Sequence, residues 1–434
     1  MNDTKHQKGL MIKGIEEMIG LKGAQFDYAI RNQIDDHAKL DIYCTVTTRK
    51  GRCPHCGGSL SHNAGTGDRI LTDLDICGVQ TAIHLTFKKY QCIEKKKGTG
   101  EICGTVYGQE ILMADPSARY TRRLENSVAE ECLRHNFSDV SQMSGLSITT
   151  VRRIAKDHYV NEEAKRMNHF YVPEVLGVDE CHLAGQMCFI MTDGIQRTAY
   201  EICRDRDPAT VRKAFQTIKD SPDSSNLKVI TMDMCIEYRN AVYDIFGQRV
   251  RVVCDIFHVI KLLNDDLIEV RKKLIEINSE VSTAGLKASA LKLRINLEDL
   301  TDVDKNDLAR QFDAVPGLMR AYALKESFRS IYRCETRREA EKCFNAFCKQ
   351  MPKKNDPLYE AYQPFRKFIN TVNAWHKEVF NYFDTDGANN SFAEAFNGLL
   401  DRIQAEGRGY SFDVLRGRAM YSGNTAYRVP EDYE

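Results

Sequence analysis

Hydrophobic and polar positions alternate with different periods along the first quarter of the chain, and each period predicts a different element. Residues 11–33 carry apolar side chains at helical spacing, which predicts a helix. These side chains are Ile12, Ile15, Met18 and Ile19. Residues 40–46 alternate as a strand does, and a second pair of strands is expected across residues 70–90. The pattern predicts a small mixed module over residues 1–110.

Three short amphipathic helices are expected in residues 111–170. Their apolar stripes are Leu124, Val128 and Cys132, then Val140 and Met143, then Val151 and Ile154. Gly145 lies at the turn before the last helix, and Ser147 suits the N-cap of that helix. The exposed polar and cationic positions that follow are Thr149, Thr150, Arg152, Arg153 and Lys156. We interpret this unit as a helix-turn-helix that binds DNA, with an ordinary helical hairpin as the alternative.

A run of strands begins after residue 171. Strands are expected at 176–182, 188–192, 198–203, 227–232 and 250–254, and helices at 208–218 and 238–246. A hairpin turn is expected at Asp193-Gly194. Three antiparallel strands followed by helix, strand, helix and strand is the order of the ribonuclease H-like fold. We therefore predict an α+β multidomain protein with a ribonuclease H-like domain over 171–258 and 386–425, interrupted by a helical insertion over 259–385.

Three acidic residues fall at positions where this fold would bring them together. Asp179 lies on the first strand, Asp233 ends the fourth, and Glu394 lies on a helix that begins near Ser391, its expected N-cap. Carboxylates are the ligands that hard divalent cations prefer, and a site with two ions catalyses phosphoryl transfer. The sequence therefore predicts that the three acids hold two Mg²⁺ or Mn²⁺ ions. The alternative is that each acid only caps a helix or faces solvent.

Other residues near these acids have weaker assignments. Asp255 and His258 follow the fifth strand and are possible neighbours of the metal site, although capping of the helix at 256–277 is favoured for Asp255. Trp375 is the single tryptophan, and we expect it to pack in a core, with stacking on a flipped base as the alternative.

The 15 cysteines of the chain suggest a metal site rather than disulfides. The N-terminal segment has no apolar core of a signal peptide, and no apolar run is long enough to span a bilayer, so we expect a soluble, cytoplasmic protein with reduced thiols. Cys53 and Cys56 form a zinc-knuckle pattern closed by two glycines, and Cys92 and Cys103 supply a second pair. The alternatives are a redox pair or unligated buried thiols. Substitute ligands would be Cys44, Cys77, His55, His62 and His84.

Charge adds little to this picture. Lysine and arginine total 61, as do aspartate and glutamate, so any contact with DNA must be local. Residues 87–97 and 402–428 are locally basic, but such runs are usually solvated surface and decide nothing alone.

Several motifs together resemble the ISL3 family of bacterial insertion-sequence transposases. They are Gly177 to Glu180, Thr231 to Met234, Val253 to Val259, Asn389 to Asn397 and Gly407 to Phe412. The cysteine module and the helix-turn-helix are also similar to that family, so the resemblance covers nearly the whole chain. It implies a DDE transposase that binds terminal inverted repeats and performs DNA strand cleavage and strand transfer, with Asp179, Asp233 and Glu394 as metal ligands.

The partners expected from this resemblance are double-stranded DNA, at the terminal inverted repeats and at the target, and further copies of the chain. A homodimer or higher oligomer is expected because two DNA ends must be paired. The protein would then lie in a bacterial cytoplasm and be nucleoid-associated when bound to DNA. Two other functions stay open: a DNA-binding regulator with an inactive transposase core, and a structure-selective nuclease that cuts without joining ends.

Overall fold

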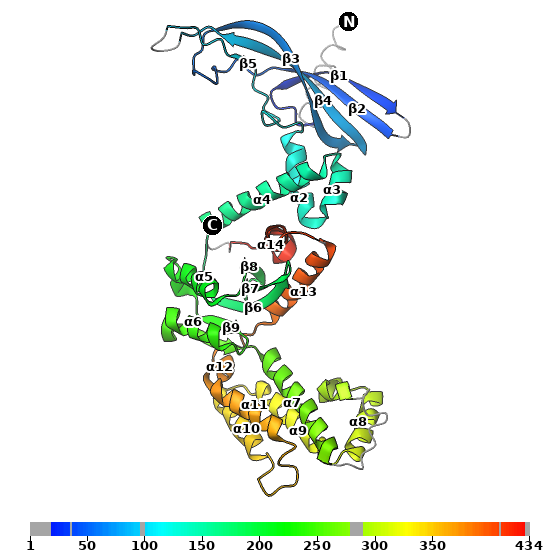
Figure 1. Cartoon of the computed structure of the whole chain (residues 1–434), viewed down its shortest axis with the longest axis vertical. Coiled ribbons are helices and arrows are strands. Elements are labelled where there is room, and N and C mark those ends of the chain that lie inside the picture. Colours follow the sequence, from blue (N-terminus) through cyan, green and yellow to red (C-terminus); the bar gives the residue numbers. More distant parts are fainter. Residues whose placement is uncertain (1–18, 35–36, 96–99, 278–289, 408, 430–434) are drawn as a thin grey trace, which may run out of the picture. The chain divides into compact units, whose positions relative to one another are not determined.

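A computed structural model describes residues 19–34, 37–95, 100–277, 290–407 and 409–429. The chain divides into two compact units, Met1–Glu163 and Ala164–Glu434, which are drawn in Figure 1. Among the described residues, no helix qualifies as a candidate membrane span.

The first unit is built on a five-stranded sheet. Its strands are β1 (Ala24–Ile34), β2 (His37–Val46), β3 (Ser61–Ile76), β4 (Val79–Cys92) and β5 (Val106–Gly108). The order is β1-β2-β4-β3, with β5 paired to β4; β2 and β4 run parallel and the other pairs are antiparallel. One face buries apolar side chains, among them Ile42, Leu71 and Ile83. The strands expected at 40–46 and 70–90 are therefore confirmed.

The helix expected over residues 11–33 is wrong from Ala24 onward, because this segment forms β1. Apolar Ala24, Phe26 and Tyr28 alternate with polar residues, which is the period of a strand. The apolar residues that suggested a helix all lie before residue 20, and positions 11–18 are outside the described residues.

Three helices follow the sheet: α2 (Arg122–Arg134), α3 (Phe137–Ser144) and α4 (Ile148–Asn168). The last residues of α4 belong to the second unit. The expected stripes are buried apart from Met143, which is 55% exposed. Gly145 ends α3 in the left-handed region, with φ 67°, where glycine is favoured. The Ser147 hydroxyl accepts from the Thr150 N–H at 3.3 Å, so the expected N-cap of α4 is confirmed.

The second unit contains a mixed sheet. Its strands are β6 (Val175–Leu183), β7 (Gln186–Asp193), β8 (Thr198–Ile202), β9 (Val229–Met232) and β10 (Arg251–Cys254), and α5 (Pro208–Asp220) and α6 (Ile236–Phe246) flank β9 in sequence. The order is β10-β9-β6-β7-β8, antiparallel between β6, β7 and β8 and parallel between β6, β9 and β10. Each strand and helix expected over residues 176–254 is present.

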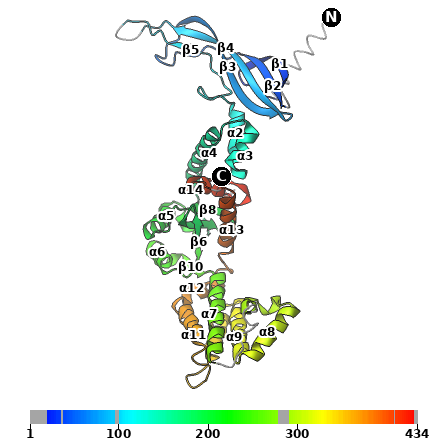
Figure 2. The same ribbon diagram turned by 45° about the vertical axis from the view of Figure 1, so that its right-hand side comes forward.

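Helices cover both faces of this sheet. Figures 1 and 2 show α5 and α6 on one side, and α13 (Ser391–Glu406) and α14 (Phe412–Tyr421) on the other. Alternation along β6 sends Leu176 and Val178 into the core with α5 and α6, and Cys181 into the core with α13. Asp179 is two residues before Cys181 on β6, so its side chain points to the same face of the sheet, which is the face that α13 covers.

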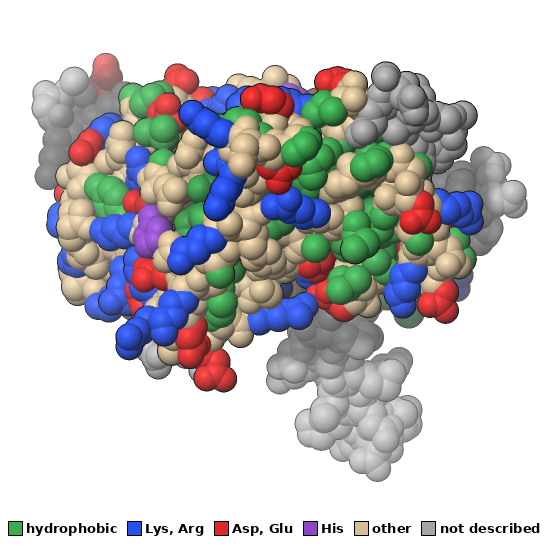
Figure 3. Space-filling view, turned by 90° about the horizontal axis from the view of Figure 1, so that it is seen from below, with side chains coloured by type: hydrophobic (Ala, Val, Ile, Leu, Met, Phe, Trp, Pro, Cys, Tyr) green, Lys and Arg blue, Asp and Glu red, His purple; other side chains and the backbone are tan. Residues whose placement is uncertain are grey.

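Helices make up most of the described residues between β10 and α13. They form α7 (Ile256–Ile277), α8 (Asp302–Ala314), α9 (Leu318–Arg329), α10 (Arg337–Lys349), α11 (Gln363–Ala374) and α12 (His376–Phe380). Short 3-10 turns lie at Ser224–Asn226, Gly247–Arg249, Ala290–Arg294, Leu297–Asp299, Ser330–Arg333, Asn381–Asp384 and Gly423–Thr425. Edge-to-face aromatic contacts help to define the helical core, such as Phe328 with Phe368 at 4.7 Å between ring centroids. The face of the molecule in Figure 3 carries interspersed basic, acidic and hydrophobic side chains, as ordinary solvated surface does.

Candidate active site and metal centres

The three acidic residues singled out in the sequence line one cavity of about 500 Å³ in the second unit. Asp179 lies within β6, Asp233 directly follows β9, and Glu394 lies in the first turn of α13. The other lining residues are Val178, Glu180, Cys235, Tyr238, Phe257, His258 and Asn397. The cavity thus brings together side chains from the central strand β6, from the end of its parallel neighbour β9 and from the covering helix α13.

The tightest group of possible ligands at the edge of this cavity differs from the expected three acids and includes Asp255, which does not line the cavity itself. Within the described residues, Asp233, Asp255 and His258 each offer a ligand atom within 4.8 Å of the others. His258 Nδ1 is 2.6 Å from Asp233 Oδ1 and 3.0 Å from Asp255 Oδ2, and it is 4.0 Å from Glu394 Oε1. One imidazole therefore connects the acids at the ends of β9 and β10.

Asp255 occupies the N-cap position of α7, yet its side chain is directed elsewhere. Its Oδ2 contacts His258, and its Oδ1 accepts from the Asn390 N–H at 3.4 Å. Neither oxygen accepts from a described backbone N–H of α7. The structure thus places Asp255 as a link between α7 and the start of α13 rather than as the expected cap.

Burial and mutual repulsion make this a site where negative charge is costly. Burial, and then the charge of nearby Asp233, raise the pKa of Asp179 to about 6. Burial, and then repulsion from Asp255, raise the pKa of Glu394 to about 7. Burial alone would lower the pKa of His258, but hydrogen bonds to Asp233 and Asp255 raise it to about 10. The carboxylates therefore surround a position that favours positive charge.

One buried carboxylate oxygen at the site, Glu394 Oε1, accepts no hydrogen bond among the described residues. Asp233 Oδ1 is also buried, and its partner is His258 Nδ1 at 2.6 Å. Unsatisfied buried acceptors are costly, and a cation satisfies them. The donor set, made of carboxylate oxygens, is the one that magnesium and manganese prefer, so the residues present fit divalent ions.

Asn390, the residue before α13, ties the third acid's helix to the strands that carry the other two. Its Nδ2 donates to the Val178 carbonyl at 3.0 Å, and its Oδ1 accepts from the Thr231 hydroxyl at 3.0 Å. Its carbonyl accepts from the Glu394 N–H at 3.3 Å. A Cβ at Gly177 would lie 2.6 Å from Asn390 Oδ1, so the glycine makes room for this amide.

Asn397 forms a second link, one turn beyond Glu394. Its Nδ2 donates to Asp179 Oδ2 at 2.9 Å and to the Glu180 carbonyl at 3.2 Å, which orients the Asp179 carboxylate. Our sequence reasoning assigned no role to Asn390 or Asn397. Their signal was an unusual density of asparagines in residues 389–397, but spacing alone did not reveal their partners.

Trp375 lies at the end of α11, is 4% exposed and packs in the helical core. The Arg239 guanidinium lies 4.1 Å from the centroid of its ring. The expectation of core packing is therefore confirmed, and stacking on a flipped base does not fit this conformation.

The side chains expected to contact DNA lie along the first three turns of α4. Thr149, Arg152, Arg153 and Lys156 are exposed, and Thr150 is half-buried. Arg153 is already engaged, because it pairs with Asp157 at 2.9 Å and donates to the Tyr120 hydroxyl. The other exposed members of this set are Thr149, Arg152 and Lys156.

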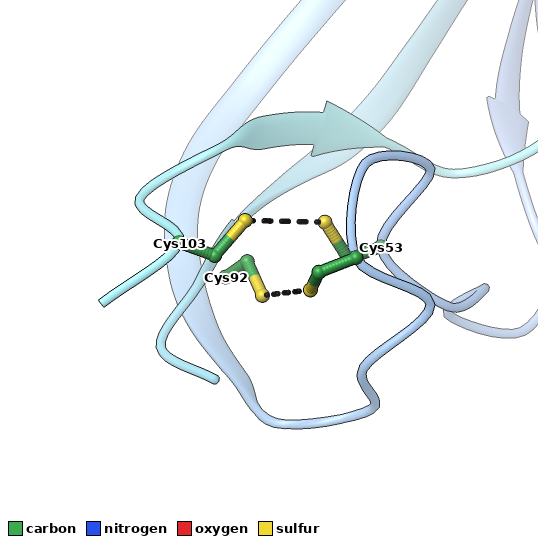
Figure 4. Close-up of side chains that lie close together, drawn as sticks. Cys53, Cys92 and Cys103 are labelled. Carbon is green, nitrogen blue, oxygen red and sulfur yellow. Dashed lines mark hydrogen bonds between the residues drawn. The ribbon is translucent and has the colours of Figure 1, made fainter. Parts of the chain in front are cut away.

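Four cysteines converge at one end of the sheet of the first unit (Figure 4). The Sγ atoms of Cys53 and Cys103 are 3.8 Å apart, and those of Cys56 and Cys92 are 3.5 Å apart. A tetrahedral zinc with bonds of about 2.3 Å requires sulfur separations of about 3.8 Å. The thiols therefore fit zinc, although ten residues separate the cysteines of the second pair.

The knuckle backbone explains how Cys53 and Cys56 face one point. The Gly57 N–H donates to the Cys53 carbonyl at 2.9 Å, and Gly57 has φ 70°, which a side chain would disfavour. A hydrogen bond from the Thr105 hydroxyl lowers the pKa of Cys103 to about 6, which favours the thiolate that binds metal.

Of the substitute ligands, His55 contacts the cluster, with Nδ1 3.6 Å from Cys103 Sγ. His84 instead pairs with Asp41 at 2.8 Å, and Cys44 is buried in the sheet core. All described cysteines are free of disulfides.

Comparison with known protein families identifies the family to which the chain belongs. A family model described as a transposase, the DDE domain of ISL3, matches residues 176–419, more than half of the chain. The chain belongs to the ISL3 family of transposases. A second model, described as the helix-turn-helix domain of transposase family ISL3, matches residues 111–159. A search of curated proteins found no match. The ISL3 resemblance is confirmed, and the chain is a DNA-processing transposase with a helix-turn-helix.

Proposed function

We propose that this ISL3 transposase cleaves and rejoins DNA strands with a DDE site formed by Asp179, Asp233 and Glu394. The observation that carries the proposal is that acids from β6, the end of β9 and α13 line one cavity, where Glu394 Oε1 is buried without a hydrogen bond among the described residues. Such a site gains stability from bound cations and is poised for phosphoryl transfer.

The strand order β10-β9-β6-β7-β8, with helices on both faces, supports a ribonuclease H-like catalytic domain. We assign it residues 171–258 and 386–425, with a helical insertion at 259–385. Residues 111–170 form the helix-turn-helix domain, and residues 1–110 the zinc-ribbon-like module.

Asp179, Asp233 and Glu394 would hold two divalent ions, magnesium or manganese. Bound there, these ions supply Lewis-acid activation of water or a 3′-hydroxyl and stabilisation of the departing oxygen. The protein's own part is to hold the carboxylates in place. Asn397 orients Asp179 through a 2.9 Å hydrogen bond, and Asn390 anchors the helix of Glu394 to β6 and β9. Asp255 and His258 lie beside the ligands, where the imidazolium balances charge when the acids are ionised.

The first unit would recognise the ends of the element. Thr149, Thr150, Arg152, Arg153 and Lys156 on α4 are assigned to the terminal inverted repeats, in the manner of a recognition helix. Cys53, Cys56, Cys92 and Cys103 would hold a structural zinc. Because two DNA ends must be joined in one reaction, we assign a homodimer or higher oligomer on DNA.

The experiment measures cleavage and strand transfer of a labelled duplex that carries an end of the element, in magnesium. Asp233→Asn removes one ligand charge and should abolish both activities, while Asp220→Asn, an exposed acid at the end of α5, should leave them unchanged. Undiminished cutting by Asp233→Asn would overturn the assignment of the site.

The same assay separates the two other functions. Binding of the duplex by the unaltered chain without cleavage in magnesium or manganese would indicate a regulator with an inactive core. Cleavage without strand transfer would indicate a nuclease. The three acids that line one cavity, with Glu394 Oε1 buried and free of hydrogen bonds among the described residues, argue for a working metal site and so against the inactive core.

A further inference from the structure

The knuckle end of the first unit carries a concentration of positive charge that the proposed function does not use. Residues 42–67 contain no aspartate or glutamate, although the whole chain has 61 acids and a net charge of zero. Residues 79–93 and 102–109 are free of acids too. Ser61 pairs with Cys92, and Tyr90 pairs with Tyr107, so the sheet brings these three segments together.

Three cations stand on the loop that leads into the knuckle: Arg49, Lys50 and Arg52. All three are exposed, and among the described residues no acid lies within ion-pair distance of either arginine. Lys88, on the neighbouring strand β4, is exposed as well. Glu94 is the nearest acid in sequence to this end of β4, and it accepts from the Leu60 N–H at 3.2 Å instead.

Hydrogen bonds fix the backbone of the loop that carries Arg49, Lys50 and Arg52. The Tyr107 hydroxyl donates to the Gly51 carbonyl at 3.3 Å, and Lys50 Nζ donates to the Ser59 carbonyl at 2.8 Å. The Cys53 N–H donates to the Gly58 carbonyl at 2.9 Å. Lys50 Nζ also lies 5.9 Å from the centroid of the Tyr90 ring. The arginines thus project from a fixed base, which lowers the entropy cost of meeting a partner.

We propose that this surface, defined by Arg49, Lys50, Arg52 and Lys88, binds the phosphate backbone of duplex DNA as a second contact beside the helix-turn-helix. The inference rests on the proposed function, because it takes the DNA partner from the transposase assignment. Exposed arginines on a fixed loop backbone, without acidic partners among the described residues, match a polyanion. Contacts to phosphates fix register, while base contacts elsewhere specify sequence.

The test is a salt titration of binding by the full-length, zinc-loaded chain. The probes are a fluorescent duplex from the DNA that flanks the coding sequence and a duplex of mixed sequence. Each phosphate contact contributes about 0.9 to the slope of log affinity against log salt, so Arg49→Ala/Arg52→Ala should reduce the slope by about 1.8 on both duplexes. Arg49→Lys/Arg52→Lys should restore most of it. Arg31→Ala, an exposed arginine near the far end of β1, is the matched control and should change nothing.

An unchanged slope in the double variant, with zinc content and circular dichroism intact, would overturn the proposal. The competing explanation is that these cations only offset the negative charge of four thiolates around zinc. If the double variant loses its zinc, a second measurement, made on the unaltered chain, still tests the proposal. DNA should shield Arg49 and Arg52, but not Arg31, from modification by phenylglyoxal, and equal modification with and without DNA would reject the proposal.

Arg152→Ala on α4 separates this inference from the proposed function. If Arg152→Ala weakens binding while the knuckle double variant does not, the transposase assignment stands and the second contact falls. If the unaltered chain retains neither duplex at about 50 mM salt, the DNA-binding part of the proposed function falls with it.

Discussion

Asn390 joins the three parts of the site, and replacing it by alanine tests whether that link sets the geometry of the acids. The amide is 1% exposed and uses both of its ends, one on the Val178 carbonyl and one on the Thr231 hydroxyl. Alanine removes both hydrogen bonds and leaves two buried polar groups without partners.

The expected change in the free energy of unfolding follows from those two buried groups. A buried polar group without a partner costs about 1–3 kcal/mol, so Asn390→Ala, which leaves two such groups, should lower the free energy of unfolding by about 2–6 kcal/mol. The Glu394 N–H bonds to the Asn390 carbonyl in the first turn of α13. Loss of the Asn390 side-chain hydrogen bonds should therefore also loosen the position of Glu394. Manganese affinity should therefore fall at temperatures where the variant is still folded.

Urea unfolding and manganese calorimetry measure the two effects. Asn240→Ala, an exposed asparagine on α6, is the control and should change unfolding by less than about 0.5 kcal/mol. If Asn390→Ala unfolds like the control, the reasoning about this link is refuted. If it is destabilised but binds manganese as tightly as the unaltered chain, Asn390 stabilises the fold without positioning Glu394.

Four further outcomes are expected. Gly177→Ala should cost about 1–3 kcal/mol in urea unfolding because its Cβ meets Asn390 Oδ1 and Thr192 Oγ1, each at 2.6 Å, and an unchanged midpoint would contradict this. Manganese affinity, measured by calorimetry, should rise between about pH 5 and about pH 8, since Asp179 and Glu394, with pKa values of about 6 and about 7, must lose protons to bind; a flat profile would count against them as ligands. The pKa of His258 is raised to about 10, so the metal-free fold gains stability that is fully present below about pH 6.5 and is lost as pH rises through the folded value. His258→Gln should therefore destabilise the metal-free chain most at low pH in thermal unfolding, and an equal loss at high pH would argue against the ion pairs. Cys103→Ser should reduce the zinc content measured by mass spectrometry and weaken the first unit, whereas full zinc retention would remove Cys103 from the ligand set.

The strands of the second unit could be predicted because their information is local. Buried runs such as residues 227–232 are bounded by turn signals, and acids at strand ends stand out against them. The stripe of α2 was equally visible in Leu124, Val128 and Cys132, all buried. The four cysteines could be grouped despite their uneven spacing, because loop length does not limit which thiols meet.

Errors arose where local preference competes with tertiary context. Met143 has the spacing of a buried residue but faces solvent, since α3 is only eight residues long and buries a narrow stripe. Ser391 was expected as the N-cap, but the helix begins at Ser391 and Asn390 occupies the cap position without a side-chain cap bond. Asn390 uses its side chain for longer-range contacts instead.

The links between the acids could not be predicted from the sequence, because their partners are far apart along the chain. Asn390 is 159 residues from Thr231 and 212 from Val178, and Asn397 is 218 from Asp179. A side-chain amide has no periodic signature, so its role depends on which strands lie beside it. For the same reason Asp255 resembled a cap, although its carboxylate turns to His258 and Asn390.

Anomalous scattering from manganese-soaked crystals of the full-length protein would show which side chains bind the metal. We expect manganese in the cavity of the second unit, with carboxylate oxygens of Asp179, Asp233 and Glu394 all among its ligands. Manganese held by Asp233, Asp255 and His258 alone, with Asp179 and Glu394 outside coordinating distance, would contradict this expectation.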